Sequence, residues 1–324
     1  MNYLRQFLRR GAESLRLRSP KPQSYDERAR QRSPRYRKPI RSGAEGNARV
    51  AAAIATARPT MVARIGYTEL TCLQFFVRSR SGRRKPPYPT GVATNMCICS
   101  GFFPAFPADP DSLDAFARLY LETVADSDVL GVMFNDFEDE IFNRYASGAD
   151  LVHLRCLEPF LFAEPWSEQL AGKRVLVIHP FAESIQRQYS DKRELLFANP
   201  KILPEFELKT LKAVQSVAGT HTEFATWFDA YQSMCDAMQQ IDFDIAIIGA
   251  GAYGLPLASF AKRLGRQAVH LGGVTQILFG IKGRRWEPPL FADTTAKMFN
   301  EHWVRPLPSE TPRAHQSVEG DAYW

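Results

Sequence analysis

The sequence predicts an α/β protein with a Rossmann-like, mostly parallel sheet and helices on both faces. Short runs such as "KRVLVIHP" and "FDIAIIGAG" are apolar at nearly every position rather than at alternate positions. Strands have this pattern when helices cover both faces of a parallel sheet. Helical patterns separate these runs along residues 44–305, and such alternation is typical of α/β folds. A hydrophobic content of 45% in 324 residues is enough for a large core.

Each element of the first half is predicted from the spacing of its apolar residues. Helices are expected where these residues recur every three or four positions, with Thr68 as one N-cap and Asp111 or Ser112 as another. Residues 79–93 hold three prolines and several basic residues and are expected to form a loop. The predicted helices are 45–57, 68–79, 111–126 and 138–146, and the predicted strands are 60–65, 128–134 and 150–155.

The second half alternates more clearly. Its helix at 253–265 ends in Gly265, the residue type that most readily adopts the left-handed conformation after a helix. The predicted strands are 173–180, 204–214, 243–251 and 267–273, and the predicted helices are 182–190, 222–241 and 253–265.

The ends of the chain differ in composition from its middle. Residues 1–42 hold 13 basic and 3 acidic residues, a charge of +10. The whole chain has a net charge of +6, so the remaining residues carry a net charge of −4. Residues 1–43 are therefore predicted to be a basic tail, with an amphipathic helix at 1–18 and a disordered linker after it. Three interpretations of this tail remain open. It has no role, it contacts an anionic membrane surface, or it is an organelle transit peptide. Residues 306–324 are expected to be a loose C-terminal tail.

Charge and cysteine content limit the class of protein. Positive charge in the tail rather than in the domain argues against nucleic-acid binding. The five cysteines are scattered, without zinc or redox spacing, which favours a reducing compartment. No run is long enough to span a membrane. We expect a cytoplasmic protein, and contact of residues 1–18 with the inner face of the cell membrane is one of the roles left open.

A glycine motif, "GAGAYG" at 249–254, lies between a predicted strand and a predicted helix. It fits the dinucleotide pattern G-x-G-x-x-G, but the next strand ends in His270 and two glycines, with no acidic residue to bind a ribose. A tight structural turn is one alternative. The other is that backbone N–H groups of the turn face the phosphate or sugar of another nucleotide. Gly249, Gly251, His179 and His270 all follow or end strands, so we expect them at one edge of the sheet.

A pair of opposite charges follows the strand at 60–65. Arg64 lies at the end of this strand, and Glu69 lies at the start of the next helix. Two interpretations remain open. The two side chains form an ion pair that ties strand to helix, or they belong to a site at the carboxyl edge of the sheet.

Two regions together resemble a known family. "ARIGYTEL" resembles the R-[YF]-G-D-G-E-[LF] motif of bacterial GT-D-type glycosyltransferases, and "DIAIIGAGAYGLPLASFAKRLGRQAVHLGG" resembles the closing β-α-β unit of that family. "GFFP" at 101–104 and the segments after it resemble its middle section. The resemblance covers roughly residues 45–285. It implies transfer of a sugar from a nucleotide-sugar donor to a glycan or lipid-linked acceptor, in the synthesis of surface polysaccharide.

The resemblance carries over to individual residues only in part. Arg64, Gly66 and Glu69 match the motif, whereas Tyr67 stands where the family has aspartate and Thr68 where it has glycine. In the family the motif carboxylates serve the metal and the nucleotide end of the donor. Three outcomes remain open: Glu69 holds Mn²⁺ or Mg²⁺ with help from elsewhere, transfer needs no metal, or this chain has lost transfer activity.

Further residues are expected at the same site. Glu69, His179 and Asp136 are the candidate bases for the acceptor hydroxyl. Arg284, Arg285 and Trp286 are candidates for contact with the donor, with guanidinium on phosphate and indole on a base or sugar ring. A core position is equally open for Trp286. The alternatives to a transferase are a non-catalytic nucleotide- or sugar-binding protein on the same fold and an NAD(P)-dependent oxidoreductase.

Overall fold

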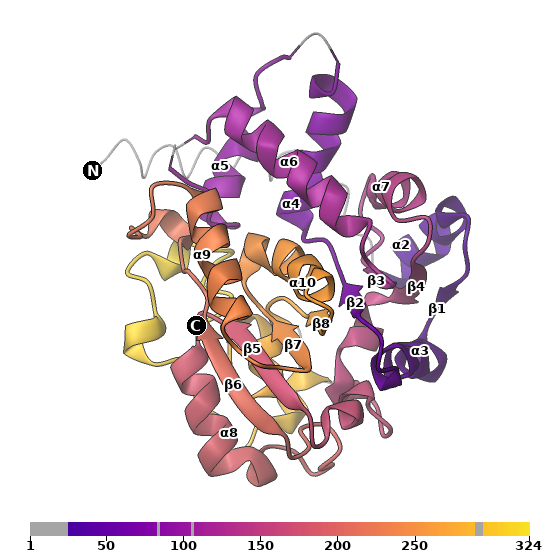
Figure 1. Ribbon diagram of the computed structural model, residues 1–324, viewed down its shortest axis with the longest axis vertical. Coiled ribbons are helices and arrows are strands. Elements are labelled where there is room, and N and C mark those ends of the chain that lie inside the picture. The colour runs from indigo at the N-terminus through magenta and orange to yellow at the C-terminus, as the bar shows by residue number, and fades with distance from the viewer. Residues whose placement is uncertain (1–24, 83–84, 105–106, 289–293) are drawn as a thin grey trace.

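A single parallel sheet forms the centre of the protein. The computed structural model describes residues 25–324 except 83–84, 105–106 and 289–293. Within that part, eight strands pair in the order β1-β4-β3-β2-β8-β7-β5-β6, all parallel (Figure 1). This confirms the predicted α/β class. The strands are β1 (Ile40–Arg41), β2 (Thr60–Ala63), β3 (Val129–Val132), β4 (Asp150–His153), β5 (Arg174–His179), β6 (Glu207–Lys212), β7 (Ile245–Ile248) and β8 (Gln267–His270).

Helices cover both faces of this sheet. They are α2 (Tyr25–Arg32), α3 (Gly43–Ala55), α4 (Tyr67–Phe75), α5 (Thr90–Ile98), α6 (Pro110–Val124), α7 (Glu138–Tyr145), α8 (Ala182–Leu196), α9 (Trp227–Gln239), α10 (Gly254–Arg263) and α11 (Val274–Leu278). A π-helix, η2 (Phe76–Arg80), continues α4, and short 3₁₀ turns include η7 (Gly251–Tyr253) and η8 (Arg284–Trp286).

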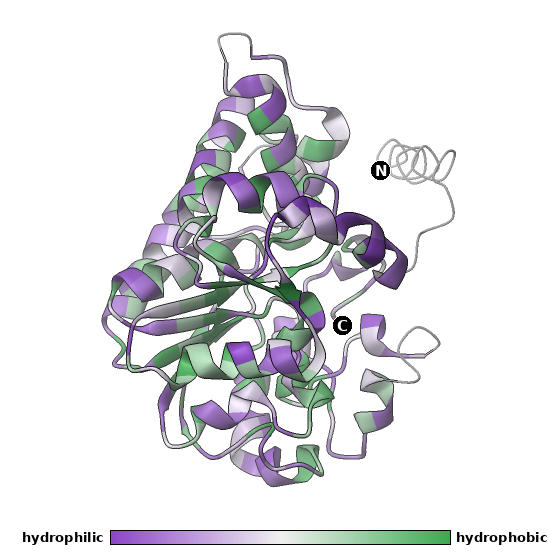
Figure 2. Cartoon of the chain, turned by 90° about the vertical axis from the view of Figure 1, so that its right-hand side faces the viewer, coloured by the Kyte–Doolittle hydropathy of each residue, from purple (hydrophilic) through white to green (hydrophobic). Residues whose placement is uncertain are grey.

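Two apolar cores lie on opposite faces of the sheet because successive side chains of a strand point to opposite faces. In β5, Leu176 and Ile178 join the core under α4, α6, α9 and α10, whereas Val175 and Val177 join the core under α3 and α8. Figure 2 shows the strands as apolar segments between helices whose outer faces are polar. Burial on both faces explains why the strands are apolar at nearly every position.

The order of the strands creates a crevice between β5 and β7. These strands are neighbours, yet the chain leaves β5 toward β6 at the edge and leaves β7 toward β8 in the opposite direction. In open parallel sheets, ligands bind outside the carboxyl ends of the strands at such a switch point. The fold therefore directs attention to the residues that follow β5, β7 and their neighbours.

The N-terminal boundary differs from the sequence-based expectation. Residues 25–43, expected to be disordered, form α2, a 3₁₀ turn and β1. Tyr36 is fully buried, and its hydroxyl donates a hydrogen bond to Glu138 at 2.7 Å. β1 pairs with β4 at the edge of the sheet. The expected amphipathic helix at 1–18 lies outside the described residues.

Other boundaries also differ. The expected loop at 79–93 contains the end of η2 and the start of α5. Gly66 rather than Thr68 is the N-cap of α4, and Asp109 caps α6 by accepting the Ser112 N–H at 2.8 Å. Within the described part of the chain, every helix is too short or too polar to cross a bilayer.

The C-terminal segment, residues 306–324, was expected to be loose, but it packs on the domain. Val318 and Trp324 are buried, and the indole N–H of Trp324 donates to the carbonyl of Glu310 at 3.3 Å. Glu310, which is also buried, accepts the backbone N–H groups of Glu183 and Ser184 in the first turn of α8. A carboxylate at a helix N-terminus is stabilised by the helix dipole, so this contact fastens the segment.

The buried carboxyl group of Glu138 should make stability depend on pH, and its hydrogen bond with Tyr36 opposes the rise in its pKa. Burial raises the pKa of Glu138 from its usual 4.5 to about 7. Between these values the folded state binds a proton that the unfolded state lacks, so stability falls as pH rises through this window. Above pH 7 the tyrosine donates to a carboxylate, a stronger bond. Tyr36→Phe should cost about 2 kcal/mol at pH 8 and about 1 kcal/mol at pH 5 in urea unfolding.

Tyr189→Phe is the matched control for this prediction. The Tyr189 hydroxyl donates to the backbone carbonyl of Phe206 at 2.9 Å, which does not titrate. Its loss should cost the same at both pH values. An equal cost of Tyr36→Phe at pH 5 and pH 8 would contradict the assignment.

Candidate functional site

A pocket lies at the carboxyl edge of the sheet, over the switch point. It encloses about 690 Å³ of space, a figure that includes solvent at its mouth. Four neighbouring strands deliver residues to it: Arg64 follows β2, Gly272 follows β8, Gly249 follows β7, and His179 ends β5. Arg64, His179 and Gly249 were predicted to share this edge or to bind the donor, and so was Gly251, which also lines the pocket. Gly272 was not singled out by the sequence.

Arg64 supplies a positive charge to this pocket. Its guanidinium lies against Gly272, where a Cβ atom would come within 2.5 Å of Nη2. Gly272 also has a φ of +66°, so glycine is favoured here for two reasons. Among the described residues, no carboxylate lies within ion-pair distance of Arg64, so the ion pair with Glu69 that the sequence left open is not formed. Its Nη1 donates to the Met133 sulfur at 3.5 Å, a weak acceptor, so the charge of the guanidinium is available to an anion.

The glycine turn after β7 supplies hydrogen-bond donors. Ala250 and Gly251 line the pocket, and Gly251 has a φ of +52°. Within the described part of the chain, the backbone N–H groups of Ala250, Gly251 and Ala252 donate to no acceptor. Successive free N–H groups before a helix make an anion-binding concavity. The turn and Arg64 thus present donors and charge to the same pocket.

Gly249 holds this turn close to its neighbours. A Cβ atom here would come within 2.6 Å of the His179 ring and of Thr275 Oγ1, and within 2.7 Å of the Gly272 carbonyl oxygen. Real Cβ atoms do not approach other atoms so closely. The absence of a side chain at Gly249 therefore lets the ends of β5, β7 and β8 meet.

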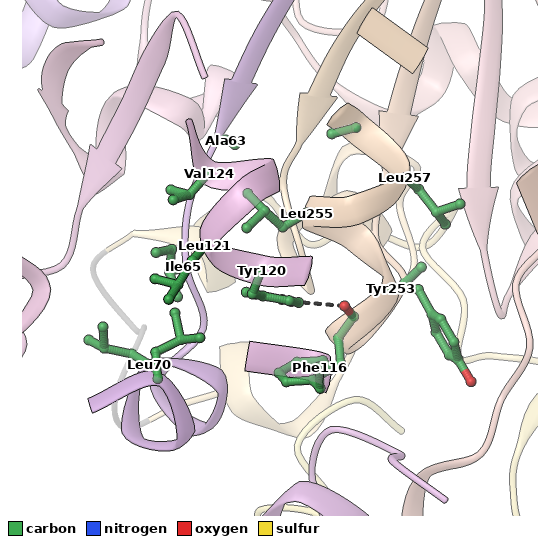
Figure 3. Packing of buried hydrophobic residues seen from close by; sticks show 14 of the residues in the cluster. Ala63, Ile65, Leu70, Phe116, Tyr120, Leu121, Val124, Tyr253, Leu255 and Leu257 are labelled. Carbon is green, nitrogen blue, oxygen red and sulfur yellow. Dashed lines mark hydrogen bonds between the residues drawn. The ribbon is translucent and has the colours of Figure 1, made fainter. Parts of the chain in front are cut away.

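Helices support the turn from behind. The Tyr120 hydroxyl in α6 donates to the carbonyl of Ala252 at 2.8 Å. Figure 3 shows Tyr120 of α6 between Phe116 of the same helix and Leu255 of α10. The ring of Tyr253 stacks on Trp227 with ring centres 4.7 Å apart. These contacts hold the free N–H groups in place before any ligand arrives.

The two histidines at this edge are neutral. Burial lowers the pKa of His179 to about 3, and burial together with the Arg64 charge lowers the pKa of His270 to about 3. His179 Nδ1 accepts the Phe181 N–H at 2.9 Å, so the ring proton is on Nε2. His179 lines the pocket as a neutral donor. His270 is outside the pocket lining and packs against Gly254, where a Cβ atom would be 2.1 Å from its ring.

Glu69 lies behind the pocket wall. Its carboxylate is buried, accepts the Ser100 hydroxyl at 2.6 Å and covers Gly66, whose Cβ position is 2.0 Å from Oε2. Ser100 itself lines the pocket. Sequence reasoning missed Ser100 because it is 31 residues from Glu69 and belongs to no motif.

The residues around Glu69 do not form a metal site. The Tyr67 side chain, at the position of the motif aspartate, is 66% exposed, and the Glu69 carboxylate is engaged by Ser100. Across the described residues, no three or more His, Cys, Asp or Glu side chains cluster as metal ligands. We therefore assign no chemical step to Mn²⁺ or Mg²⁺.

Asp136 is not part of this pocket. Its side chain is exposed, forms an ion pair with Arg32 at 2.8 Å and borders a separate polar depression together with Tyr67 and Arg78. It follows β3, so it lies at the carboxyl edge as expected, but it does not line the same pocket as Arg64.

The three residues of "RRW" hold the C-terminal segment. Arg284 pairs with Asp321 at 3.6 Å, and Arg285 pairs with Glu319. Trp286 is 4% exposed, lies under Gly273 and Gly283, and is absent from the pocket lining. Of the two interpretations of this tryptophan, the core position is the one found.

The C-terminal segment completes the pocket wall. Val318, Tyr323 and Trp324 line it opposite the glycine turn. The only sequence signal was the return of large apolar residues in "DAYW" after a polar stretch. Such a signal does not say which part of the domain the residues cover.

Gly249→Ala tests the close packing at this edge. The added methyl group has to displace the His179 ring or the backbone of Gly272, which should lower the free energy of unfolding by about 1–3 kcal/mol. Gly91→Ala is the control because a Cβ atom at Gly91 in α5 meets nothing within 4 Å. Urea unfolding should leave this control unchanged or slightly more stable. A Gly249→Ala protein as stable as wild type would contradict the packing.

Comparison with known proteins gives two distant structural neighbours. No protein-family model matches the chain, and no curated protein matches its sequence. One similar solved structure is described as a selenomethionine-substituted domain of unknown function 1792, with a TM-score of 0.44. Another is described as the highly conserved domain of unknown function 1792 with a distinct glycosyltransferase fold, with a TM-score of 0.45. Each is 12% identical, and the alignments cover 87% of this chain and 96% of the other.

Proposed function

We propose that this protein binds the diphosphate of a nucleotide sugar in the switch-point pocket and transfers the sugar to an acceptor hydroxyl. The observation that carries the proposal is that Arg64, which has no carboxylate partner among the described residues, lines one pocket together with the glycine turn, whose Ala250, Gly251 and Ala252 N–H groups are free. The resemblance of "ARIGYTEL" to the GT-D motif supports the same reading.

The arrangement suits a leaving group that gains charge. When the bond between the sugar and the diphosphate breaks, negative charge develops on the diphosphate oxygen. Preorganised N–H groups and an arginine lower the energy of such a state because they need no reorganisation. Arg64 also presents a planar fork that matches two phosphate oxygens. Neutral His179 adds an N–H donor without a competing charge.

Glu69 is the base that we assign to the reaction, acting through Ser100. The acceptor oxygen forms a bond to the anomeric carbon, and the bonding pair to the diphosphate leaves with the phosphate oxygen. The acceptor proton passes to Ser100 Oγ, while the Ser100 proton passes to Glu69, whose carboxylate already accepts it at 2.6 Å. His179 is a poor base at neutral pH because burial holds its pKa near 3.

The acceptor and the setting belong to the same proposal. A glycan or lipid-linked sugar acceptor, and a role in surface polysaccharide synthesis at the inner face of the cell membrane, rest on the sequence resemblance. The basic residues among residues 1–18 suit an anionic lipid surface.

A second candidate is a protein that binds nucleotide sugars without turning them over. The exposed Tyr67 at the position of the motif aspartate favours it, since that carboxylate is missing from the chain. This candidate predicts the same donor binding and no release of nucleoside diphosphate. An oxidoreductase would instead bind NADH or NADPH.

Arg64→Met tests donor binding. The experiment is a thermal-shift and calorimetric screen of the full chain with the glucose, galactose and N-acetylglucosamine esters of UDP, GDP and dTDP, and with NADH and NADPH. Saturation at 100 times Kd should add about 2.7 kcal/mol to wild type. Loss of a charged hydrogen bond to phosphate should weaken binding by about 10- to 100-fold.

Arg118→Met is the control for Arg64→Met. Arg118 is exposed on α6 over Phe76, outside the pocket, so its loss removes the same charge without touching the site. Equal affinities of wild type and Arg64→Met would sink the proposed phosphate contact. Binding of NADH alone would favour the oxidoreductase.

Glu69→Gln separates transfer from binding. The amide keeps the size of the side chain but cannot take up the Ser100 proton. Donor affinity should stay within about twofold, while release of nucleoside diphosphate in the presence of a membrane lipid extract should fall by about 10²- to 10⁴-fold. Glu122→Gln, an exposed position on α6, should behave as wild type. Unchanged release by Glu69→Gln would remove Glu69 from the reaction.

A further inference from the structure

Gln276 in α11 has a buried acceptor atom without a partner. The side chain is fully buried, and the residue lines the pocket. Its Nε2 donates to the carbonyls of Ile281 at 3.3 Å and Tyr323 at 3.1 Å. An exchanged amide would place Oε1 against those two oxygens, so the orientation is determined. Among the described residues, Oε1 accepts no hydrogen bond.

An unfilled acceptor in this position needs an explanation. A buried polar atom without a partner is costly, and native proteins keep few of them. Gln276 lies four residues after Gly272, which cradles the Arg64 guanidinium, and all three residues line the pocket. The orphan acceptor therefore belongs to the same wall that offers positive charge to an anion.

We propose that Gln276 Oε1 accepts a hydrogen bond from a sugar hydroxyl of the ligand and thereby sets its specificity. This inference rests on the proposed donor site. A phosphate cannot fill the vacancy because its oxygens also accept. In a nucleotide sugar, the diphosphate is flanked by the ribose on one side and by the transferred sugar on the other. A group beside the Arg64 phosphate contact is thus a sugar hydroxyl from one of these two rings.

The C-terminal segment is the wall that has to yield for this contact. Without ligand, Oε1 is buried away from solvent. Tyr323 covers Gln276 on this side, and its backbone carbonyl accepts a hydrogen bond from Gln276 Nε2. Glu319 and Asp321 before Tyr323 have φ values of +48° and +75°, which cost energy for residues with side chains. Their ion pairs with Arg285 and Arg284 are partly exposed and contribute little. We therefore expect residues 319–323 to be the part of the wall that yields to the ligand, while Glu310 and Trp324 keep the rest of the segment anchored.

Gln276→Met tests the contact, with Gln188→Met as the matched control. Gln188 is also buried, and its Nε2 also donates to two backbone carbonyls, of Gly280 at 3.2 Å and His302 at 2.9 Å, but it is outside the pocket lining. Calorimetry with the nucleotide sugars of the screen above, the nucleoside diphosphates and the sugar 1-phosphates should show affinity reduced about tenfold or more by Gln276→Met only.

Comparing the ligands identifies which sugar hydroxyl binds Gln276. A loss that is already seen with the nucleoside diphosphate assigns the ribose, and a loss seen only when the transferred sugar is present assigns that sugar. Both outcomes support the inference. Because Gln276→Met also removes an unpaired acceptor, its free energy of unfolding should fall less than that of Gln188→Met.

Three results would overturn the inference. Unchanged affinity of Gln276→Met, with Arg64→Met still impaired, would remove Gln276 and leave the donor site standing. Wild type that binds none of the phosphate ligands would remove both. If Gln276→Met does not fold, the test is binding of deoxy analogues of the ligand to the wild-type protein. One analogue should bind about tenfold more weakly than the ligand. Equal binding of all analogues would overturn the contact.

Discussion

At the end of β7, Gly249 lets three strand ends come closer than any side chain would allow. The ring of His179, the hydroxyl of Thr275 and the carbonyl of Gly272 all lie within 2.7 Å of its Cβ position. This contact joins the end of β5 to the end of β8 across the switch point. The free N–H groups of the turn, the cradle of Arg64 and the start of α10 all depend on it, because each is attached to one of these strand ends.

Electrostatics at this edge follow from how the charges are distributed. Glu69 is withdrawn behind Ser100, and the two nearby histidines are neutral because burial lowers their pKa values. Arg64 therefore keeps its positive charge without a carboxylate partner in the described part of the chain. An ion pair between Arg64 and Glu69 would have cancelled that charge. The neutral histidines and the buried carboxylate leave one cation and a set of N–H groups facing the pocket, which favours an anionic ligand.

Two segments outside the central repeat of strands and helices, residues 25–43 and 306–324, fasten to the domain, and the second of them helps to close the site. The N-terminal segment fastens to the β3–α7 turn through Tyr36 and Glu138, away from the pocket. The C-terminal segment is fastened by Glu310 to α8 and supplies Tyr323 and Trp324 to the pocket wall. The sheet thus provides the floor of the pocket. The wall is held by the buried Glu310 carboxylate, by backbone hydrogen bonds from Arg284 and Arg285 to the end of the chain and by partly exposed ion pairs. A ligand that needs Gln276 would act on this wall.

Periodicity in the sequence determined the seven main strands, most helices and the placement of Arg64, His179 and the glycine turn at one edge, because these features depend on neighbours a few residues away. Only the tertiary structure decided that Arg64 stays unpaired, that Glu69 meets Ser100, that Trp286 is a core residue and that Asp136 lies elsewhere. These outcomes depend on contacts between residues far apart in the chain. The same holds for residues 25–43 and 306–324, whose polar composition suggested disorder, but a few buried groups, Tyr36, Glu310 and Trp324, hold them in place.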